Sequence, residues 1–261
     1  GHWRSGTTLL HELMLHDSHF VAPTTLQCMN PNHFLVTGWI VRLLGFLLPE
    51  KRPMDDMATG WDRPQEDEFA LANMGQPSPY LDVAFPREPR QYPESLTLDK
   101  MTPAARKRWK QALLFFLHRI TLGQNKPILI KSPPHTARVK TLLEMFPGAR
   151  FILITREPED VFASTIKLWF ALQSSQGLQH PDPLLLKDKV LRDFVEMFKA
   201  FNRDKALIPP AQFSHIRYAD LVDAPVESLK NVYADLHLEG FDKVRPHVEA
   251  YFAAHGDYAA G

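Results

Sequence analysis

The sequence predicts an α/β fold, in which a P-loop-type central parallel sheet is flanked by helices. In the second half of the chain, short apolar strands alternate with helical segments. A glycine-containing turn at Gly1 to Thr8 leads directly into a helix. Residues 31–125 have a mostly helical pattern and lack linker composition, so they form a largely helical insertion. Residues 1–261 are therefore predicted to be a single domain.

The first half of the chain is predicted to be mainly helical. Proline in a first helical turn and threonine as an N-cap mark where several of these helices begin. A proline-rich segment at 75–99 is expected to be irregular, and its length favours a role in shaping a binding site. The predicted helices cover Thr7 to His16, Pro31 to Leu48, a short segment opened by Pro64, and Pro103 to Leu122.

The second half supplies the predicted sheet. Strands are expected at 127–131, 150–155 and 213–217, since each is a short apolar run beside turn residues. Helices are expected at 136–146, 158–175, 186–207, 225–238 and 244–254. A phosphate loop normally follows a buried strand, so we also expect a further strand immediately before Gly1.

Composition limits the class of protein. The 30 basic and 30 acidic residues cancel, which argues against bulk binding of nucleic acid. One cysteine, Cys28, cannot form an internal disulfide and suits a reducing, cytoplasmic compartment. No segment reaches the ~18 apolar residues needed for a transmembrane helix. The sequence does not indicate an oligomeric state.

The opening turn has the residues of a phosphate-binding loop with one important change. The pattern G-x-x-x-x-G-K-[ST] would place lysine at position 7, where this chain has Thr7. Arg4 is the basic residue instead. Backbone N–H groups and hydroxyls at a helix N-terminus can still bind a phosphate. The loop is not typical of one that binds ATP and magnesium.

A second basic motif follows the strand at 150–155. The strand delivers Arg156 to its carboxyl end, and Ser164 follows in the helix opened by Pro158. Arginine binds phosphate in a bidentate manner, and a serine hydroxyl can add a further bond. A metal-binding NTPase would place an acid where Arg156 stands, so no metal site is expected here. The alternative for Arg156 is a surface ion pair with Glu159 or Asp160.

Together, the R-S-G-T-T loop and the R-x7-S motif resemble the PAPS-dependent sulfotransferases. The likeness is greatest to the branch containing tyrosylprotein sulfotransferases and many bacterial enzymes. It implies PAPS as co-substrate, PAP as product and no metal. It also implies 3′-phosphate contacts for Arg156 and Ser164. The contacts implied for the 5′-phosphosulfate are Arg4, Ser5, Gly6, Thr7 and Thr8.

The same resemblance implies catalytic roles. Lys131 matches a lysine that approaches the bridging oxygen of the donor, and Arg4 would stabilise the same charge. The general base remains open among Glu66, Glu68 and His135, with His33 as a further rival. Each has a structural alternative: first-turn acids suit the helix dipole, and His135 could cap a helix. Tyr218, in an R-Y-x-D-L segment, is implied to lie near the nucleotide, or else is a buried structural tyrosine.

The acceptor is predicted from the apolar character of the insertion. Its aromatic residues favour a small-molecule or lipid-like acceptor, such as a sterol or another hydrophobic alcohol or phenol, although a peptide tyrosine stays possible. The residues concerned are Trp39, Phe46, Trp61, Tyr80 and Phe85. Two other functions remain open, a P-loop kinase or NTPase and a non-catalytic PAP-binding relative.

Overall fold

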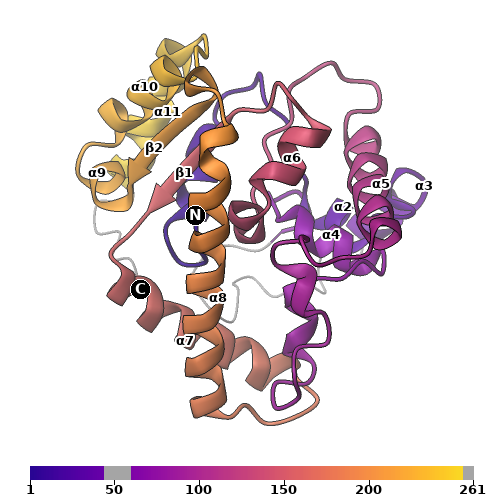
Figure 1. Ribbon diagram of the computed structural model, residues 1–261. Helices are drawn as coiled ribbons and strands as arrows, with labels where there is room; N and C mark the ends of the chain where they lie inside the picture. Colours follow the sequence, from indigo (N-terminus) through magenta and orange to yellow (C-terminus); the bar gives the residue numbers. More distant parts are fainter. Residues whose placement is uncertain (44–59, 255–261) are drawn as a thin grey trace.

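The computed structural model describes residues 1–43 and 60–254 (Figure 1). Its α-helices are α1 (Thr7–Met14), α2 (Thr25–Met29), α3 (Phe34–Leu43), α4 (Asp67–Asn73), α5 (Pro103–Ile120), α6 (Val139–Met145), α7 (Pro158–Gln176), α8 (Pro183–Asp204), α9 (Tyr218–Asp223), α10 (Pro225–Asp235) and α11 (Phe241–Ala254). Its strands are β1 (Phe151–Thr155) and β2 (Phe213–Arg217). Short 3₁₀ helices cover Pro79–Val83, Pro93–Ser95, Pro133–Ala137, Lys205–Leu207 and Pro210–Gln212.

The two strands form a parallel pair, as predicted, in a register that joins Phe151 to Phe213 and Thr155 to Arg217. The predicted strand at 127–131 is wrong, because that segment makes only one isolated parallel bridge, between Ile128 and Val21. Pro127 lacks the N–H group of a regular ladder. On its other side, the segment borders a cavity instead of a strand.

Several predicted helix boundaries differ from those in the structure. Helix α3 begins at Phe34 instead of Pro31, and residues 44–48 with Phe46 lie outside the described residues. Helix α4 begins at Asp67 instead of Pro64, because Pro64 forms an antiparallel bridge with Thr24. The predicted helix at 136–146 is divided into a 3₁₀ helix and α6.

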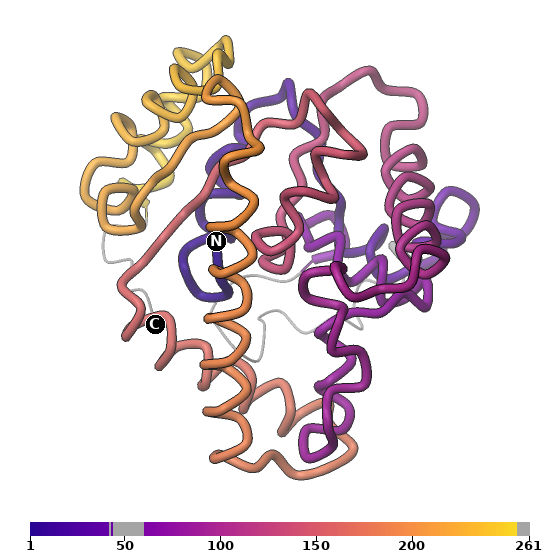
Figure 2. Tube along the Cα trace, in the orientation of Figure 1, coloured from indigo at the N-terminus to yellow at the C-terminus, as the bar shows by residue number. Residues whose placement is uncertain are grey.

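The apolar residues gather in three main clusters. One joins α1 to both strands and to α10 and α11. A second joins α2, α4 and α5, and Figure 1 shows these helices grouped with α3 on the opposite side from β2. The third packs Trp3 against α7 and α8, and Figure 2 shows the N-terminal loop passing behind α8. The loop therefore connects the third cluster, through Trp3, to the first cluster, through α1.

Within residues 1–43 and 60–254, no helix combines the length and apolar character needed to cross a membrane.

The buried ring of His11 makes the stability of the fold depend on pH. Burial, together with the charge of Lys131, lowers the pKa of His11 from 6.5 to about 4. Between these values the unfolded chain binds more protons than the folded one, so stability falls as the pH falls. From about pH 7 to about pH 5, the expected loss is about 2 kcal/mol of unfolding free energy from this residue.

The His11→Gln variant tests this expectation, since its amide can still donate to the carbonyl oxygen of Leu129, 3.2 Å from His11 Nε2. Urea unfolding measures the free energy of unfolding at about pH 7 and at about pH 5. Between these two pH values, the variant should lose about 2 kcal/mol less unfolding free energy than the unmodified protein loses. His2 also has its pKa lowered to about 4 by burial, so some acid sensitivity should remain. An unchanged pH dependence in the variant would contradict the assignment to His11.

Candidate functional site

The opening loop holds a conformation that requires glycine at position 6. Gly6 has φ of 94°, in the left-handed region that glycine adopts most readily. A Cβ atom there would lie 2.3 Å from the ring of Tyr218, so this close approach leaves no room for a side chain. Ser5 closes the turn by donating its hydroxyl to the carbonyl oxygen of His2 at 2.7 Å. Helix α1 begins at Thr7, directly after Gly6, and its N-terminal amides form the end of the helix dipole that favours anions.

The parallel strands bring two predicted nucleotide contacts together. Because Thr155 pairs with Arg217, the residues that follow, Arg156 and Tyr218, leave the sheet at the same edge. The Arg156 guanidinium lies 4.9 Å from the centroid of the Tyr218 ring. Arg156 also forms an ion pair with Asp160, with 3.4 Å between Nε and Oδ2, which is one of the two ion pairs named above as the alternative to phosphate binding. The Tyr218 ring therefore connects Arg156 to Gly6.

The loop and the start of α7 are in direct contact. Arg4 has a positive φ of 64°, and its Nε donates to Ser164 Oγ at 2.8 Å. Ser164 is buried in the second turn of α7. The two motifs that were predicted from separate parts of the sequence thus form one continuous polar surface. Its basic groups, hydroxyls and helix N-terminus are the groups that bind phosphate esters.

A second group of polar residues lies beside Thr8. The Lys131 ammonium donates to Glu66 Oε1 at 2.6 Å and lies 3.4 Å from Thr8 Oγ1. The other carboxylate oxygen of Glu66 accepts from the hydroxyl of Tyr80. Tyr80 in turn accepts from Trp3 Nε1 at 2.8 Å. A chain of hydrogen bonds therefore fixes Glu66 beside the loop, with both carboxylate oxygens engaged.

Glu68, only two residues from Glu66, faces the interior. Its side chain is fully buried and forms a bidentate pair with Arg138, at 2.5 and 3.1 Å. Arg138 also donates to the carbonyl oxygens of Ser95 and Leu96. This carboxylate has its charge matched inside the core and is not accessible, which does not suit a base that must meet an acceptor hydroxyl.

His135 lies at the end of the segment that carries Lys131. Its Nε2 lies 2.7 Å from Oδ2 of the buried Asp67, which also accepts from Ser132 at 2.7 Å. Although burial alone would raise the pKa of Asp67, His135, Ser132 and Arg138 hold it below its usual value. The Nδ1 atom of His135 is buried and has no hydrogen-bond partner in the described structure. His33 lies elsewhere, on the exposed surface, beside Thr37 at 2.6 Å.

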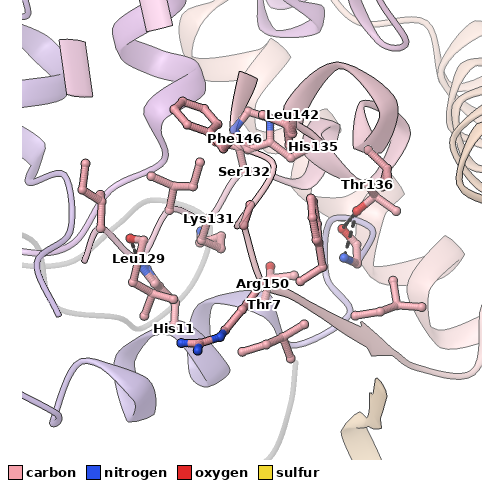
Figure 3. A pocket seen from close by; sticks show the side chains of 18 of the residues that line it. Thr7, His11, Leu129, Lys131, Ser132, His135, Thr136, Leu142, Phe146 and Arg150 are labelled. Atoms are coloured by element: carbon pink, nitrogen blue, oxygen red, sulfur yellow. Dashed lines mark hydrogen bonds between the residues drawn. The ribbon is translucent and has the colours of Figure 1, made fainter. Parts of the chain in front are cut away.

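A cavity of about 690 Å³ separates the segment at 128–132 from β1. Figure 3 shows Lys131, Ser132 and His135 along one wall and Thr7 and His11 of α1 below them. The remaining lining is largely apolar, from Ile128 to Ile130 and from Phe151 to Ile154. The cavity therefore lies between β1 and the segment that carries Lys131 and His135.

Comparison with protein families identifies the family of the chain. A model of the sulfotransferase family, described as "Sulfotransferase family", matches residues 1–243. The chain belongs to the sulfotransferase family. Two curated relatives are named omega-hydroxy-beta-dihydromenaquinone-9 sulfotransferase Stf3, from Mycobacterium bovis and from Mycobacterium tuberculosis. Each is 41% identical over 258 residues, which cover 99% of this chain. The chain spans 66% of the length of these relatives.

Two solved sulfotransferases share the fold. STF9 from Mycobacterium avium superposes with a TM-score of 0.78 at 19% identity, covering 98% of this chain and 67% of that one. STF1 from Mycobacterium tuberculosis H37Rv gives a TM-score of 0.67 at 17% identity, covering 97% and 71%. The predicted α/β class is thereby confirmed, with a smaller regular sheet than the sequence indicated.

The candidate site brings most of the predicted residues together. Arg4, Ser5, Gly6, Thr7 and Thr8 form the loop, Arg156, Ser164 and Tyr218 adjoin it, and Lys131 and Glu66 lie beside Thr8. The sequence did not indicate roles for Trp3 or Asp67, and it indicated Tyr80 only as one of the aromatic residues of the insertion. Their roles depend on contacts with distant residues, for which no local pattern exists. Within the described parts of the chain, no group of His, Cys, Asp or Glu could hold a metal ion.

Proposed function

We propose that this chain transfers a sulfuryl group from PAPS to the hydroxyl of a hydrophobic alcohol. The observation that carries the proposal is the position of Glu66 and Lys131 beside Thr8, at the start of the helix that the phosphate loop opens. The Stf3 relatives are named for a hydroxylated menaquinone, which supports a lipid-like acceptor. PAPS and PAP are the donor and product that the loop chemistry favours.

The described residues suit a nucleotide with two separate phosphate groups. The Tyr218 ring packs against Gly6, which has no Cβ, so the turn keeps the compact shape in which the N–H groups at the start of α1 can donate to an oxyanion. Ser5, Thr7 and Thr8 would add hydroxyl groups to this 5′ site. Arg156 and Ser164 would hold the 3′-phosphate. Arg4, which already contacts Ser164, would lie between the two phosphate sites.

In the proposed reaction, the acceptor oxygen forms a bond to sulfur while the bond from sulfur to the bridging phosphate oxygen breaks. Glu66 takes the proton of the acceptor hydroxyl, and PAP leaves with the bonding electron pair. Lys131 and Arg4 stabilise the negative charge that grows on the leaving phosphate. No covalent enzyme intermediate is needed, because in-line displacement depends mainly on position and charge, as in phosphoryl transfer.

The hydrogen bonds around Glu66 support its role as the general base. Tyr80 and Lys131 fix the orientation of the carboxylate, and a fixed base costs less reorganisation when the acceptor arrives. The pKa of Tyr80 is raised well above 10 by burial and by the charge of Glu66, so Tyr80 stays protonated and donates. His135, paired with Asp67, remains the alternative base.

The cavity is better suited to a strand than to the acceptor. Its long walls are the backbone segments 128–132 and 150–154, whereas Glu66 is absent from its lining. We propose that an extended apolar segment on the N-terminal side of Gly1 fits there and extends the parallel sheet. The acceptor would then approach Glu66 from the side of the helical insertion, residues 31–125.

Thermal unfolding with different nucleotides tests the proposed donor. A ligand that binds only the folded protein contributes about 2.7 kcal/mol at one hundred times its Kd. PAP without metal should therefore raise the Tm, while ATP with magnesium should not. Stabilisation by ATP with magnesium alone would favour a kinase or NTPase. Stabilisation by PAP without turnover on any alcohol or phenol would indicate a non-catalytic relative.

The Arg156→Ala variant should weaken PAP binding by about tenfold to a hundredfold, since hydrogen bonds to charged groups contribute about 1.5–3 kcal/mol. The fold should remain intact, because the partner Asp160 is 58% exposed and needs no buried counter-charge. Isothermal titration with PAP measures the change. Arg245→Ala is a matched control, because Arg245 forms a similar surface ion pair, with Asp242 in α11. Equal PAP affinity in both variants would exclude Arg156 from the nucleotide site.

A further inference from the structure

Helix α3 buries one side and exposes a continuous apolar side. Phe34 and Gly38 face inward, and a Cβ at Gly38 would lie 3.3 Å from Leu26 of α2. The other side carries large apolar residues at the spacing that places side chains on one helix surface. They are Leu35 (47% exposed), Val36 (73%), Trp39 (64%), Ile40 (43%) and Leu43 (69%). We call these five residues the α3 apolar face.

Single exposed apolar residues are common, but a contiguous group of five on one helix is typical of an interaction surface. Trp39 adds a specific indication. Tryptophan is enriched where an apolar phase meets water, because its ring is apolar and its N–H can bond to water or a headgroup. An amphipathic helix that lies in a lipid interface has the same combination.

The charge around this face suits a lipid surface. A basic residue, Arg119 of α5, lies beside α3, with its guanidinium 5.7 Å from the centroid of the Phe34 ring, and between Asp17 and Glu50 the sequence contains no acidic residue. The stretch between Asp17 and Glu50 therefore carries no carboxylate that would repel the phosphates of a bilayer. A membrane surface is commonly anionic, and it attracts basic residues that lie within about 10 Å, one Debye length at 0.1 M salt. A soluble protein partner would require no such depletion of acids.

The α3 apolar face is also connected to the proposed catalytic base. Helix α2, on which α3 packs, is held by backbone hydrogen bonds from Thr25 to Arg63 and from Leu26 to Trp61, both 2.9 Å. Gln65 N–H donates to the carbonyl oxygen of Pro23 at 2.8 Å, and Glu66 is the next residue. Figure 1 shows α2, α3 and α4 on the same side of the molecule. The exposed face and the segment that presents Glu66 therefore form one hydrogen-bonded unit.

We infer that the α3 apolar face docks on the surface of a lipid bilayer, from which the enzyme takes its hydrophobic alcohol. This inference rests on the proposed function, because the lipid is then both the docking surface and the phase that contains the acceptor. Docking shortens the path of an alcohol that is nearly insoluble in water. It leaves transfer to a short, water-soluble alcohol unaffected.

Sedimentation with phosphatidylcholine vesicles that contain phosphatidylglycerol tests the inference. The double variant Val36→Asp with Leu43→Asp should bind these vesicles about tenfold or more weakly than the unmodified protein, since charged residues oppose insertion. Its turnover of a long-chain alcohol embedded in the vesicles should fall by a similar factor. Its turnover of a short soluble alcohol should not change, because both side chains are exposed on the side of α3 that faces away from α2, at 73% and 69%.

The matched control is Leu122→Asp with Leu184→Asp, which changes two leucines of similar exposure, 69% and 72%, outside α3. This control should bind vesicles as the unmodified protein does. Equal vesicle binding by both double variants would overturn the inference. So would a dimer in light scattering that only the α3 variant disrupts, because the face would then bind a second copy. Failure of the proposed function is a separate result, seen as absence of stabilisation of the unmodified protein by PAP.

Discussion

Replacement of Glu66 by glutamine is expected to lower kcat by about 10²–10⁴-fold, the usual contribution of a general base. Glutamine has nearly the same shape, and its carbonyl oxygen can still accept from Lys131 or from Tyr80. It cannot take a proton from the acceptor hydroxyl. The affinity for PAP should therefore stay close to that of the unmodified protein. Initial rates at saturating PAPS, together with titration of PAP, measure the two effects.

Two further variants separate the base from its surroundings. Tyr80→Phe keeps the carboxylate but removes one hydrogen bond that orients it, so a smaller loss of kcat is expected than for Glu66→Gln. His135→Asn tests the alternative base that pairs with Asp67. If Glu66→Gln keeps full kcat while His135→Asn loses it, the base is His135, and the role proposed for Glu66 is wrong.

Replacement of Arg138 by methionine is expected to reduce the free energy of unfolding by about 3–5 kcal/mol, the usual cost of removing one partner of a buried ion pair. Both side chains of the pair with Glu68 are fully buried, so the substitution would leave the carboxyl group of Glu68 in the core without its partner. Two backbone carbonyl groups, of Ser95 and Leu96, would also lose a donor. Urea unfolding followed by circular dichroism measures the change.

A double variant tests whether the cost comes from the unpaired charge. Adding Glu68→Leu to Arg138→Met removes both charges, and it should recover part of the stability lost by Arg138→Met alone. Residual activity of the folded fraction should be close to normal, because neither residue contacts the loop. A folded and fully stable Glu68→Gln variant with a large loss of kcat would instead place Glu68 in the catalytic site.

The contrast between Glu66 and Glu68 shows the limit of local pattern. Both acids lie in the run Gln65-Glu66-Asp67-Glu68, and the sequence offered no means to choose between them. Backbone conformation decides the matter: Glu66 is extended and precedes α4, whereas Glu68 lies in the first turn of that helix. One side chain therefore reaches Lys131, and the other reaches Arg138, 70 residues away.

The missing third strand has a similar origin. The segment 127–131 has the composition of a buried strand, but a regular ladder also needs a neighbouring segment that pairs with it over several residues. Among the described residues, Val21 supplies a single bridge on one side, and the cavity borders the other. The composition of the segment predicts an extended backbone. Whether a regular strand forms depends on which segments of the folded chain lie beside it.

The sequence by itself determined the family and the α/β class, and it predicted which residues bind anions, because these depend on short motifs. A loop of fixed spacing opens a helix, and a buried strand places Arg156 at its carboxyl end, whatever else the chain does. Only the tertiary structure decided that Arg4 meets Ser164, that Tyr218 packs on Gly6, and that Glu66 faces Lys131. Each of these contacts joins residues more than 60 positions apart, and it depends on how separately folded elements pack, which no local spacing encodes.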